Sequence, residues 1–358
     1  EVLGKPAPGL PTLTEPSIVA AEDLAPAETA TLDRSLVLGI VTRAGGLTSH
    51  TAILAAQMGI PAVVHCADAL SIEAGTSVSI DGDSGAVVVN PTAESVAALA
   101  DRDSKRDTLL SATSGPGKTS DGHAVGLLAN IGGVDDAVAA GAQDLEGVGL
   151  FRTEFCFLDQ PEEPTVEAQV EAYQGVLEAF PGKKVVVRTL DAGADKPLPF
   201  LTDATEANPA LGVRAYRTAR RDPEVLEHQL EALAKAEAET DAHVWVMAPM
   251  ISTTEEAKAF AEKARSYGLK TAGMMIEVPS AAILADKMFE HADFASIGTN
   301  DLTQYTMAAD RLLGSVASFQ DPWHPAVLRL IKATADGGKA NGKPVGICGE
   351  AAADPLLA

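Results

Sequence analysis

The sequence is poor in cysteine and in basic residues, and it contains no long apolar run. Its 3 cysteines in 358 residues are too few and too scattered for a disulfide framework or a zinc site. The 27 Lys and Arg against 50 Asp and Glu leave a formal net charge of −23, which repels nucleic-acid backbones and anionic lipid. No apolar run approaches the ~20 residues that span a bilayer, and no signal segment opens the chain. We therefore expect a cytoplasmic protein with no nucleic acid and no membrane as partner.

Residues 1–99 mix short β-rich runs with turns. Apolar runs predict strands at residues 17–21, 36–41, 61–64, 77–80 and 86–89. The last two flank Asp-Gly-Asp-Ser-Gly, which indicates a hairpin turn. A helical stretch begins near residue 92, gains charge toward its end and runs into Gly-Pro-Gly. We expect residues 1–99 to form one domain and residues 100–122 to form a linker helix and loop.

The remaining residues, 123–358, repeat a pattern of strand, loop and helix. Seven apolar runs predict strands at residues 124–131, 147–151, 184–190, 244–250, 271–278, 294–300 and 344–350, with alanine-rich amphipathic helices between them. Apolar strands that alternate with helices favour an α/β fold with a parallel sheet buried on both faces, most simply a (β/α)8 TIM-type barrel. Because such a barrel needs an eighth strand, we expect this chain to be truncated.

Charged residues follow these strands at the end where a barrel places its chemistry. Arg152 directly follows the strand predicted at residues 147–151, and Arg188 lies at the end of the next one. Arg214 ends the segment 208–214, and Arg311 lies ten residues after Asp301. One such arginine is explained by a salt bridge on the rim. Four on one face of an acidic protein indicate a pocket for a small, multiply charged anion, phosphate or carboxylate.

Two carboxylates and a cysteine end neighbouring strands of the same predicted barrel. Glu277 and Asp301 are close enough in this scheme to share a hard divalent cation, and their small number favours Mg²⁺ over Zn²⁺. Pairing with the arginines is the alternative. Cys348 is either a small buried residue or, beside cations and an open site, a proton donor or nucleophile.

A second centre lies in the first domain, where Gly45-Gly46 and hydroxyl residues precede an alanine-rich helix. His50 falls in the first turn of that helix, where the dipole and free N–H groups favour an anion. Such a histidine either serves as a nucleophile that carries a phosphoryl group or has only a capping role.

These segments resemble the family of enzymes that use phosphoenolpyruvate (PEP), and within it enzyme I of the sugar phosphotransferase system. The His50 segment with residues 61–64 is similar to the swivelling phosphohistidine domain of that family. Six further segments resemble the PEP-binding barrel of that family: residues 149–155, 187–191, 208–214, 275–279, 298–305 and 346–350. The stretch from Asp191 to Pro199 resembles enzyme I in particular.

The resemblance implies a role for each matching residue. His50 takes the phosphoryl group of PEP, and Cys348 protonates the pyruvate enolate. PEP is held by Arg152, Arg188, Arg214, Arg311, Asn300 and Asp301, and Mg²⁺ by Glu277 and Asp301. The phosphoryl group then passes to the phosphocarrier protein HPr. The linker at residues 100–122 must let the domains swing, and a homodimer through the barrel is implied.

The chain also departs from the family pattern. Many relatives have Arg where this chain has Ala56, and the subdomain that docks HPr and the eighth barrel strand are not in this sequence. Two alternative functions are compatible with the motifs. One is a fragment of a dikinase such as PEP synthase or pyruvate phosphate dikinase, and the other is a regulator that senses PEP without catalysis. Retention of both the nucleophile and the acid argues against the regulator.

Overall fold

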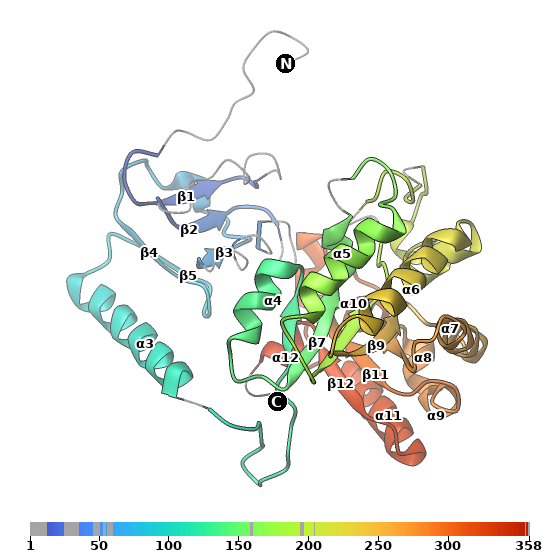
Figure 1. Cartoon of the computed structure of the whole chain (residues 1–358). Coiled ribbons are helices and arrows are strands. Elements are labelled where there is room, and N and C mark those ends of the chain that lie inside the picture. Colours follow the sequence, from blue (N-terminus) through green and yellow to red (C-terminus); the bar gives the residue numbers. More distant parts are fainter. Residues whose placement is uncertain are drawn as a thin grey trace. The chain divides into compact units, whose positions relative to one another are not determined.

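A computed structural model describes residues 13–24, 36–45, 51–52, 55, 60–112, 114–157, 160–193, 197–203, 205–354 and 356. The chain divides into two compact units. One comprises Glu1–Thr113 with Ala309–Gln320, and the other Ser114–Ala308 with Asp321–Ala358. Figure 1 shows the elements of each unit, and their positions within each unit follow from the pairing described next.

The first unit contains a small parallel sheet and a hairpin. The sheet has the order β1-β2-β3, with β1 at Ser17–Ala21, β2 at Val37–Thr42 and β3 at Ala62–Val63. The hairpin pairs β4 (Val78–Asp81) antiparallel with β5 (Ala86–Val89), and Gly85 takes the positive φ of 72° that its turn requires. Two apolar clusters hold the unit, one around Ile40 and one around Ile80. The predicted strands and the hairpin are confirmed.

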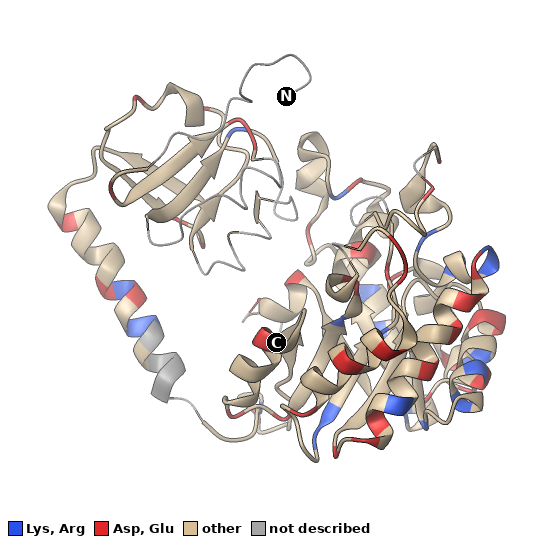
Figure 2. Ribbon diagram, turned by 45° about the horizontal axis from the view of Figure 1, so that its top comes forward, with Lys and Arg blue, Asp and Glu red and all other residues tan. Residues whose placement is uncertain are grey.

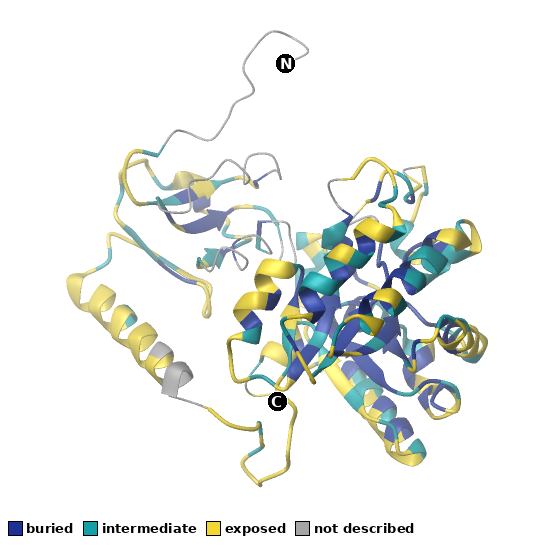
Figure 3. Ribbon diagram, viewed as in Figure 1, coloured by how far each residue is buried: buried dark blue, intermediate teal, exposed yellow. Residues whose placement is uncertain are grey.

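Helix α3 (Ala93–Ala112) follows the hairpin and has mostly exposed side chains where they are described, as its yellow ribbon shows (Figure 3). It is tied to the hairpin by Arg102, whose Nη1 and Nη2 donate to the two carboxylate oxygens of Asp81 at 2.8 Å. Arg106 reaches Asp83 at 2.8 Å. These ion pairs, rather than an apolar face, attach the helix to its own unit.

The second unit is built on seven parallel strands in consecutive order. They are β6 (Ala129–Ile131), β7 (Gly147–Arg152), β8 (Lys184–Arg188), β9 (His243–Ala248), β10 (Thr271–Ile276), β11 (Ala295–Gly298) and β12 (Val345–Cys348). The long helices are α4 (Val134–Gly141), α5 (Val166–Leu177), α6 (Pro223–Ala238), α7 (Thr254–Ser266), α10 (Thr299–Met307) and α11 (Pro325–Asn341). Short helical segments are η2 (Thr153–Cys156), η3 (Pro209–Leu211), η4 (Ala215–Arg220), α8 (Pro279–Ile283), α9 (Ala285–Met288) and α12 (Glu350–Ala353).

The sheet curls, so it buries side chains on both faces. The larger apolar cluster lies between the strands and the helices and includes Phe151, Tyr173 and Phe260. A second cluster lies on the other face and joins Leu150 of β7 to Met275 of β10, with Cys348 of β12 packed against it. Contact across that face brings distant strands together, as expected for the inside of a barrel. Figure 3 shows the dark-blue buried strands ringed by helices with exposed outer faces.

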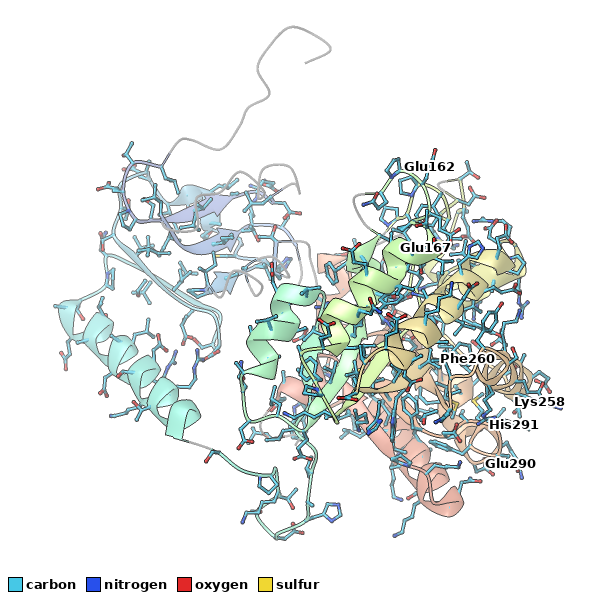
Figure 4. The ribbon with its side chains drawn as sticks, in the orientation of Figure 1. Glu162, Glu167, Lys258, Phe260, Glu290 and His291 are labelled. Carbon is cyan, nitrogen blue, oxygen red and sulfur yellow. The ribbon has the colours of Figure 1, made fainter. Side chains whose placement is uncertain are left out.

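Figure 2 shows Lys, Arg, Asp and Glu of this unit mostly on its outer helices and loops. Glu162, Glu167 and Lys258 are exposed, and Figure 4 shows Glu162 and Lys258 at the edge of this unit. Phe260, on the same helix as Lys258, is instead buried against the sheet. Exposed charged residues and buried apolar residues on one helix form the amphipathic pattern that is typical of helices packed around a sheet. The prediction of seven parallel strands is confirmed.

One strand is much shorter than predicted. The apolar run at residues 124–131 indicates a long strand, but only Ala129–Ile131 pairs with β7. Val125 donates its amide to the Gly117 carbonyl instead, and Ala124 forms an isolated antiparallel bridge with Lys118. Val125 and Leu127 are exposed, so apolar character at these positions does not come from burial in the sheet.

Candidate active site

The charged residues singled out in the sequence converge on the carboxyl-terminal edge of the parallel sheet. Arg152 and Arg188 are the last residues of β7 and β8 and are register partners. Glu277 follows β10 directly, and Cys348 ends β12. Asp301 lies in the first turn of α10, just after β11, rather than on the strand itself. Parallel strands present these ends on one edge, where barrel proteins carry their sites.

Arg188 and Arg214 are joined through one buried carboxylate. Asp191 forms an ion pair with each arginine: its Oδ2 lies 3.1 Å from Nη1 of Arg188, and its Oδ1 lies 2.9 Å from Nη2 of Arg214. All three residues are at most 5% exposed. Arg214 also donates from Nη1 to Asp301 at 3.0 Å and to the hydroxyl of Tyr305 at 3.3 Å. The arginines are therefore held in fixed positions before any ligand arrives.

The carboxylates keep both of these guanidinium groups charged. Burial alone would lower the pKa of Arg214, but the carboxylates of Asp191 and Asp301 raise it above its ordinary value. The pKa of Arg188 is raised in the same way, since Glu154 and Asp191 outweigh its burial.

Arg152 differs from the other two because no carboxylate bonds to it among the described residues. Its guanidinium lies over the ring of Phe155, 4.9 Å from the ring centroid. Burial lowers its pKa, and nearby Arg188 acts in the same direction while Glu154 opposes both. A partly buried cation that stacks on an aromatic ring is suited to receive an anion.

Several buried polar atoms at this edge lack a hydrogen-bond partner within the described part of the chain. They include the Nε atoms of Arg152, Arg188 and Arg214 and the Oε2 atom of Glu154. Leaving a buried polar group unsatisfied costs about 1–3 kcal/mol. Three unsatisfied N–H donors on three neighbouring arginines match the acceptor oxygens of a small anion, as the sequence predicts.

Glu277 is almost completely buried, and its Oε1 accepts the amide of Met250 at 2.6 Å. Met250 has a positive φ of 58°, an uncommon conformation for a residue other than glycine, and such strain is concentrated at functional sites. Burial, followed by the charges of Asp301 and Asp191, raises the pKa of Glu277 to about 8. Mutual repulsion of these carboxylates would be relieved by a cation.

These residues can be tested as a metal site by their donor set. Among the described residues no group of three or more His, Cys, Asp and Glu side chains is arranged to hold a metal ion. Mg²⁺ is commonly bound by one or two protein carboxylates, with waters and substrate phosphate oxygens at its other positions. Glu277 and Asp301 fit Mg²⁺ in that mode and do not fit a metal that needs three protein ligands. Pairing with an arginine, the alternative for these carboxylates, is seen for Asp301.

Hydrogen bonds join the end of β12, which carries Cys348, to the start of α10, which carries Asn300. The thiol of Cys348 lies 3.4 Å from the carbonyl of Ile297, to which it donates. Burial raises the pKa of this thiol, which keeps it protonated. The side-chain oxygen of Asn300 accepts the amide of Glu350 at 2.9 Å, and Thr299 donates to the Cys348 carbonyl. The end of β12 is thus fixed to the start of α10.

Two candidate residues are not placed at this edge by the described structure. His50 lies outside the described residues. Arg311 is half-buried and belongs to Ala309–Gln320, which groups with the first unit. The prediction that Arg311 joins the other arginines therefore stays a prediction.

Three residues of the cluster were not among the candidate site residues. Glu154 is completely buried and bonds to Arg188, Asp191 pairs with two arginines, and Tyr305 bonds to Arg214. The acidic residues follow strand ends in the sequence, so the rule that selects the arginines also applies to them. Tyr305 ends the segment 298–305 that resembles the family, but nothing local in the sequence indicates its bond to Arg214.

A curled parallel sheet with arginines and carboxylates along its carboxyl-terminal edge defines a barrel-type α/β protein. Comparison with known families agrees with this class. Residues 108–358 match the PEP-utilising enzyme, PEP-binding domain, and residues 13–85 match the PEP-utilising enzyme, mobile domain. The chain belongs to the family of PEP-utilising enzymes.

Curated relatives are homologous over the whole chain. A phosphoenolpyruvate-protein phosphotransferase of Streptomyces coelicolor is 55% identical over 359 aligned residues, covering 100% of this chain and 65% of that protein. A protein of the same name from Bacillus subtilis is 41% identical, covering 99% of this chain and 65% of that protein. The chain thus spans about two-thirds of the length of these relatives, 65% in each case.

Among solved structures, an HpcH/HpaI aldolase/citrate lyase family protein from Burkholderia cenocepacia aligns with a TM-score of 0.40 and 16% identity, covering 64% of this chain and 80% of that chain. No described helix is long and apolar enough to cross a membrane.

Proposed function

We propose that this chain takes the phosphoryl group of PEP onto His50 and passes it to the phosphocarrier HPr, the first step of the sugar phosphotransferase system. The observation that carries the proposal is the set of three arginines whose buried Nε donors have no hydrogen-bond partner at the sheet edge within the described part of the chain. The homologues that span the whole chain are named phosphoenolpyruvate-protein phosphotransferases, which supports a protein as acceptor.

PEP carries a carboxylate and a phosphate on a short skeleton, and the arginine cluster offers charge to both. Arg188 and Arg214 are already oriented by Asp191, whereas Arg152 rests on Phe155 and can turn to the ligand. In the proposal Asn300 and Arg311 complete the binding of PEP, in accordance with the family motif. Because binding groups fixed in advance lose little freedom, the cluster favours tight and oriented binding.

Glu277 and Asp301 hold Mg²⁺ in this proposal. When bound there, Mg²⁺ would neutralise the charge on the phosphate oxygens. Without a cation, burial and then the repulsion of Asp301 and Asp191 raise the pKa of Glu277. Asp301 would then divide its oxygens between Arg214 and the metal, linking the anion pocket to the cation site.

The reaction breaks the bond between phosphorus and the enol oxygen of PEP and forms a bond between phosphorus and a ring nitrogen of His50. The electron pair of the broken bond remains on the enolate of pyruvate. Cys348 donates its thiol proton to the methylene carbon of that enolate, giving pyruvate and a thiolate that regains a proton from solvent. The raised pKa of Cys348 suits it to this acid role.

The domain organisation of the proposal follows the sequence. Residues 1–99 carry His50, residues 100–122 form the linker and residues 123–358 carry the PEP site. His50 must reach that site and also an HPr molecule, so the linker permits rigid-body motion. We further propose a cytoplasmic homodimer that assembles through the barrel unit.

The test is release of pyruvate from PEP by the chain in the presence of Mg²⁺, compared with a His50→Ala variant. The proposal expects a burst of pyruvate stoichiometric with the wild-type protein and none from the variant. Calorimetric titration with PEP should show that His50→Ala still binds PEP. Equal pyruvate release by both proteins, or binding without any release by the wild type, would contradict the proposal.

A further inference from the structure

Glu154 is a buried charged residue with no role in the proposal so far. It belongs neither to the anion pocket, the name used here for Arg152, Arg188 and Arg214, nor to the metal pair, Glu277 and Asp301. It lies in η2, two residues after Arg152, and its side chain is completely buried. An isolated buried carboxylate is strongly disfavoured, so its presence here depends on the contacts that it makes.

A single oxygen of Glu154 makes both of its hydrogen bonds. Oε1 accepts Nη2 of Arg188 at 2.9 Å and the backbone amide of Asp191 at 2.8 Å. These two donors belong to the two ends of the turn that follows β8. Glu154 therefore fixes the distance between the guanidinium of Arg188 and the backbone of the residue that pairs with Arg214.

The amides between those ends are fixed from other directions. The Leu190 amide donates to the side-chain oxygen of Gln229 at 2.9 Å, and the Thr189 amide donates to the Met247 carbonyl at 2.9 Å. Gln229 is itself held by Thr153 and Tyr173, each at 3.0 Å. Of the three anchors on this turn, Glu154 alone also bonds to a guanidinium of the anion pocket.

We propose that Glu154 is a positioning residue for PEP, which acts through Arg188 and the Asp191 turn and does not touch the substrate. Its Oε1 sets the orientation of Arg188, and its unsatisfied Oε2 lies within reach of the charge of Arg152. The inference deepens the proposed function because it takes PEP as the anion that the pocket binds.

An electrostatic role and a positioning role of Glu154 predict different effects of its substitution on PEP binding. Replacing Glu154 by Gln removes a negative charge next to an anion pocket, so electrostatics alone predicts tighter binding of PEP. Replacing it by Asp keeps the charge and withdraws it by one methylene, so electrostatics alone predicts little change. Gln keeps an oxygen that can accept both bonds but turns the charge-assisted bond from Arg188 into a weaker one, and Asp withdraws the oxygen by one methylene. If Glu154 acts by position, both substitutions hold Arg188 less firmly and weaken PEP binding.

The experiment measures the rate of the single turnover of pyruvate release against PEP concentration, with Mg²⁺, for the wild-type chain, Glu154→Gln, Glu154→Asp and a control. KM and kcat here denote the half-saturating PEP concentration and the maximal rate of that turnover. We expect KM for PEP to rise at least tenfold in both variants and kcat to fall less than KM rises. The control is Glu163→Gln, the same substitution at a carboxylate that pairs with His228 away from the anion pocket. It should keep the wild-type KM and kcat.

A double-mutant cycle with Arg188→Lys tests whether the effect passes through Arg188. We expect Glu154→Gln to raise KM less than threefold in that background. Thermal denaturation of each variant separates folding from function. Lower stability with wild-type KM in the folded fraction would overturn the inference, as would a lowered KM for Glu154→Gln or independent effects of the two substitutions.

Direct titration with PEP separates this inference from the proposed function. If the wild-type chain binds PEP but releases no pyruvate, the proposed reaction fails while the ratio of dissociation constants still tests Glu154. A ratio of ten or more for both variants would support the inference, and a ratio near one would overturn it. A wild-type chain that binds no PEP would overturn both.

Discussion

Arg214 binds Asp301 across the sheet edge, with Nη1 3.0 Å from Oδ1, although the two residues are 87 positions apart in the sequence. The ion pair joins the loop before η4 to the first turn of α10. It also connects a cation of the anion pocket to a carboxylate of the proposed metal pair. Binding of a metal and of an anion should therefore affect each other, because both draw on this contact.

Replacement of Arg214 by Met should destabilise the second unit. The substitution leaves Asp191 and Asp301 buried without this partner, and breaking a buried pair typically costs about 3–5 kcal/mol. Urea denaturation measures the change. Arg220→Met is the matched control, because Arg220 pairs with Glu256 with 75% of its side chain exposed and should cost ~1 kcal/mol or less. Equal losses would contradict the role assigned to burial.

A Gly212→Ala substitution should weaken PEP binding. A Cβ at this position would lie 1.6 Å from Oε1 of Glu206, the oxygen that also accepts the Val213 amide at 2.9 Å. The Glu206 carboxylate must move and give up its bond to the Val213 amide, which loosens the loop next to Arg214, so we expect KM for PEP to rise severalfold. Gly133→Ala is the control, since no described atom lies within 4 Å of its Cβ. A wild-type KM in Gly212→Ala would show that the loop adapts without moving Arg214.

Glu277→Gln should have opposite effects with and without Mg²⁺. Burial and neighbouring carboxylates raise the pKa of Glu277 to about 8 from the ordinary 4.5, so the folded state holds this proton more tightly than the unfolded state. Stability without metal is therefore highest below about pH 4.5 and falls as pH rises toward 8. The variant should lose this part of the pH dependence.

With Mg²⁺ present the wild type should be more stable than Glu277→Gln, because a ligand that binds only the folded state stabilises it. Thermal melts from pH 5 to 8, with and without Mg²⁺ and PEP, measure both effects. Stabilisation of Glu277→Gln by Mg²⁺ to the same extent as the wild type would contradict the assignment of Glu277 as a ligand.

The link between α3 and the hairpin should weaken in acid. The hydrogen bonds from Arg102 and Ser84 hold the pKa of Asp81 well below its usual range. A lowered pKa contributes stability above the unfolded value of 3.8, and this contribution is lost as pH falls further. Asp81→Asn should destabilise the first unit at pH 7 and differ less from the wild type near pH 2. Asp103→Asn, at an exposed side chain, should show no such change.

The order of elements could be predicted because it depends on local pattern. Each apolar run of the second unit that is bounded by turns forms a strand, and the arginines that end β7 and β8 are visible as charges after those runs. The exception is the run at residues 124–131, where Val125 and Leu127 are apolar but exposed. Hydrophobicity indicates burial only on average, and pairing to Gly117 decides the structure there.

The internal connections of the site could not be predicted, because they depend on tertiary distance. Glu154 reads as one more acidic residue after a strand, and nothing local indicates that it meets Asp191 and Arg188. Met250 and Ala215 both have a positive φ near the site, and neither is a glycine. Their backbone conformation is imposed by contacts such as the bond from Met250 to Glu277, which sequence spacing does not reveal.

The central claim is that His50 receives the phosphoryl group of PEP, and intact-mass analysis after incubation with PEP and Mg²⁺ tests it most directly. We predict an adduct with the mass of one phosphoryl group that is lost in acid, is stable in alkali, and is missing from His50→Ala. Peptide mapping should place it on His50. An adduct on another residue, or none on a wild-type chain shown to bind PEP, would contradict the account.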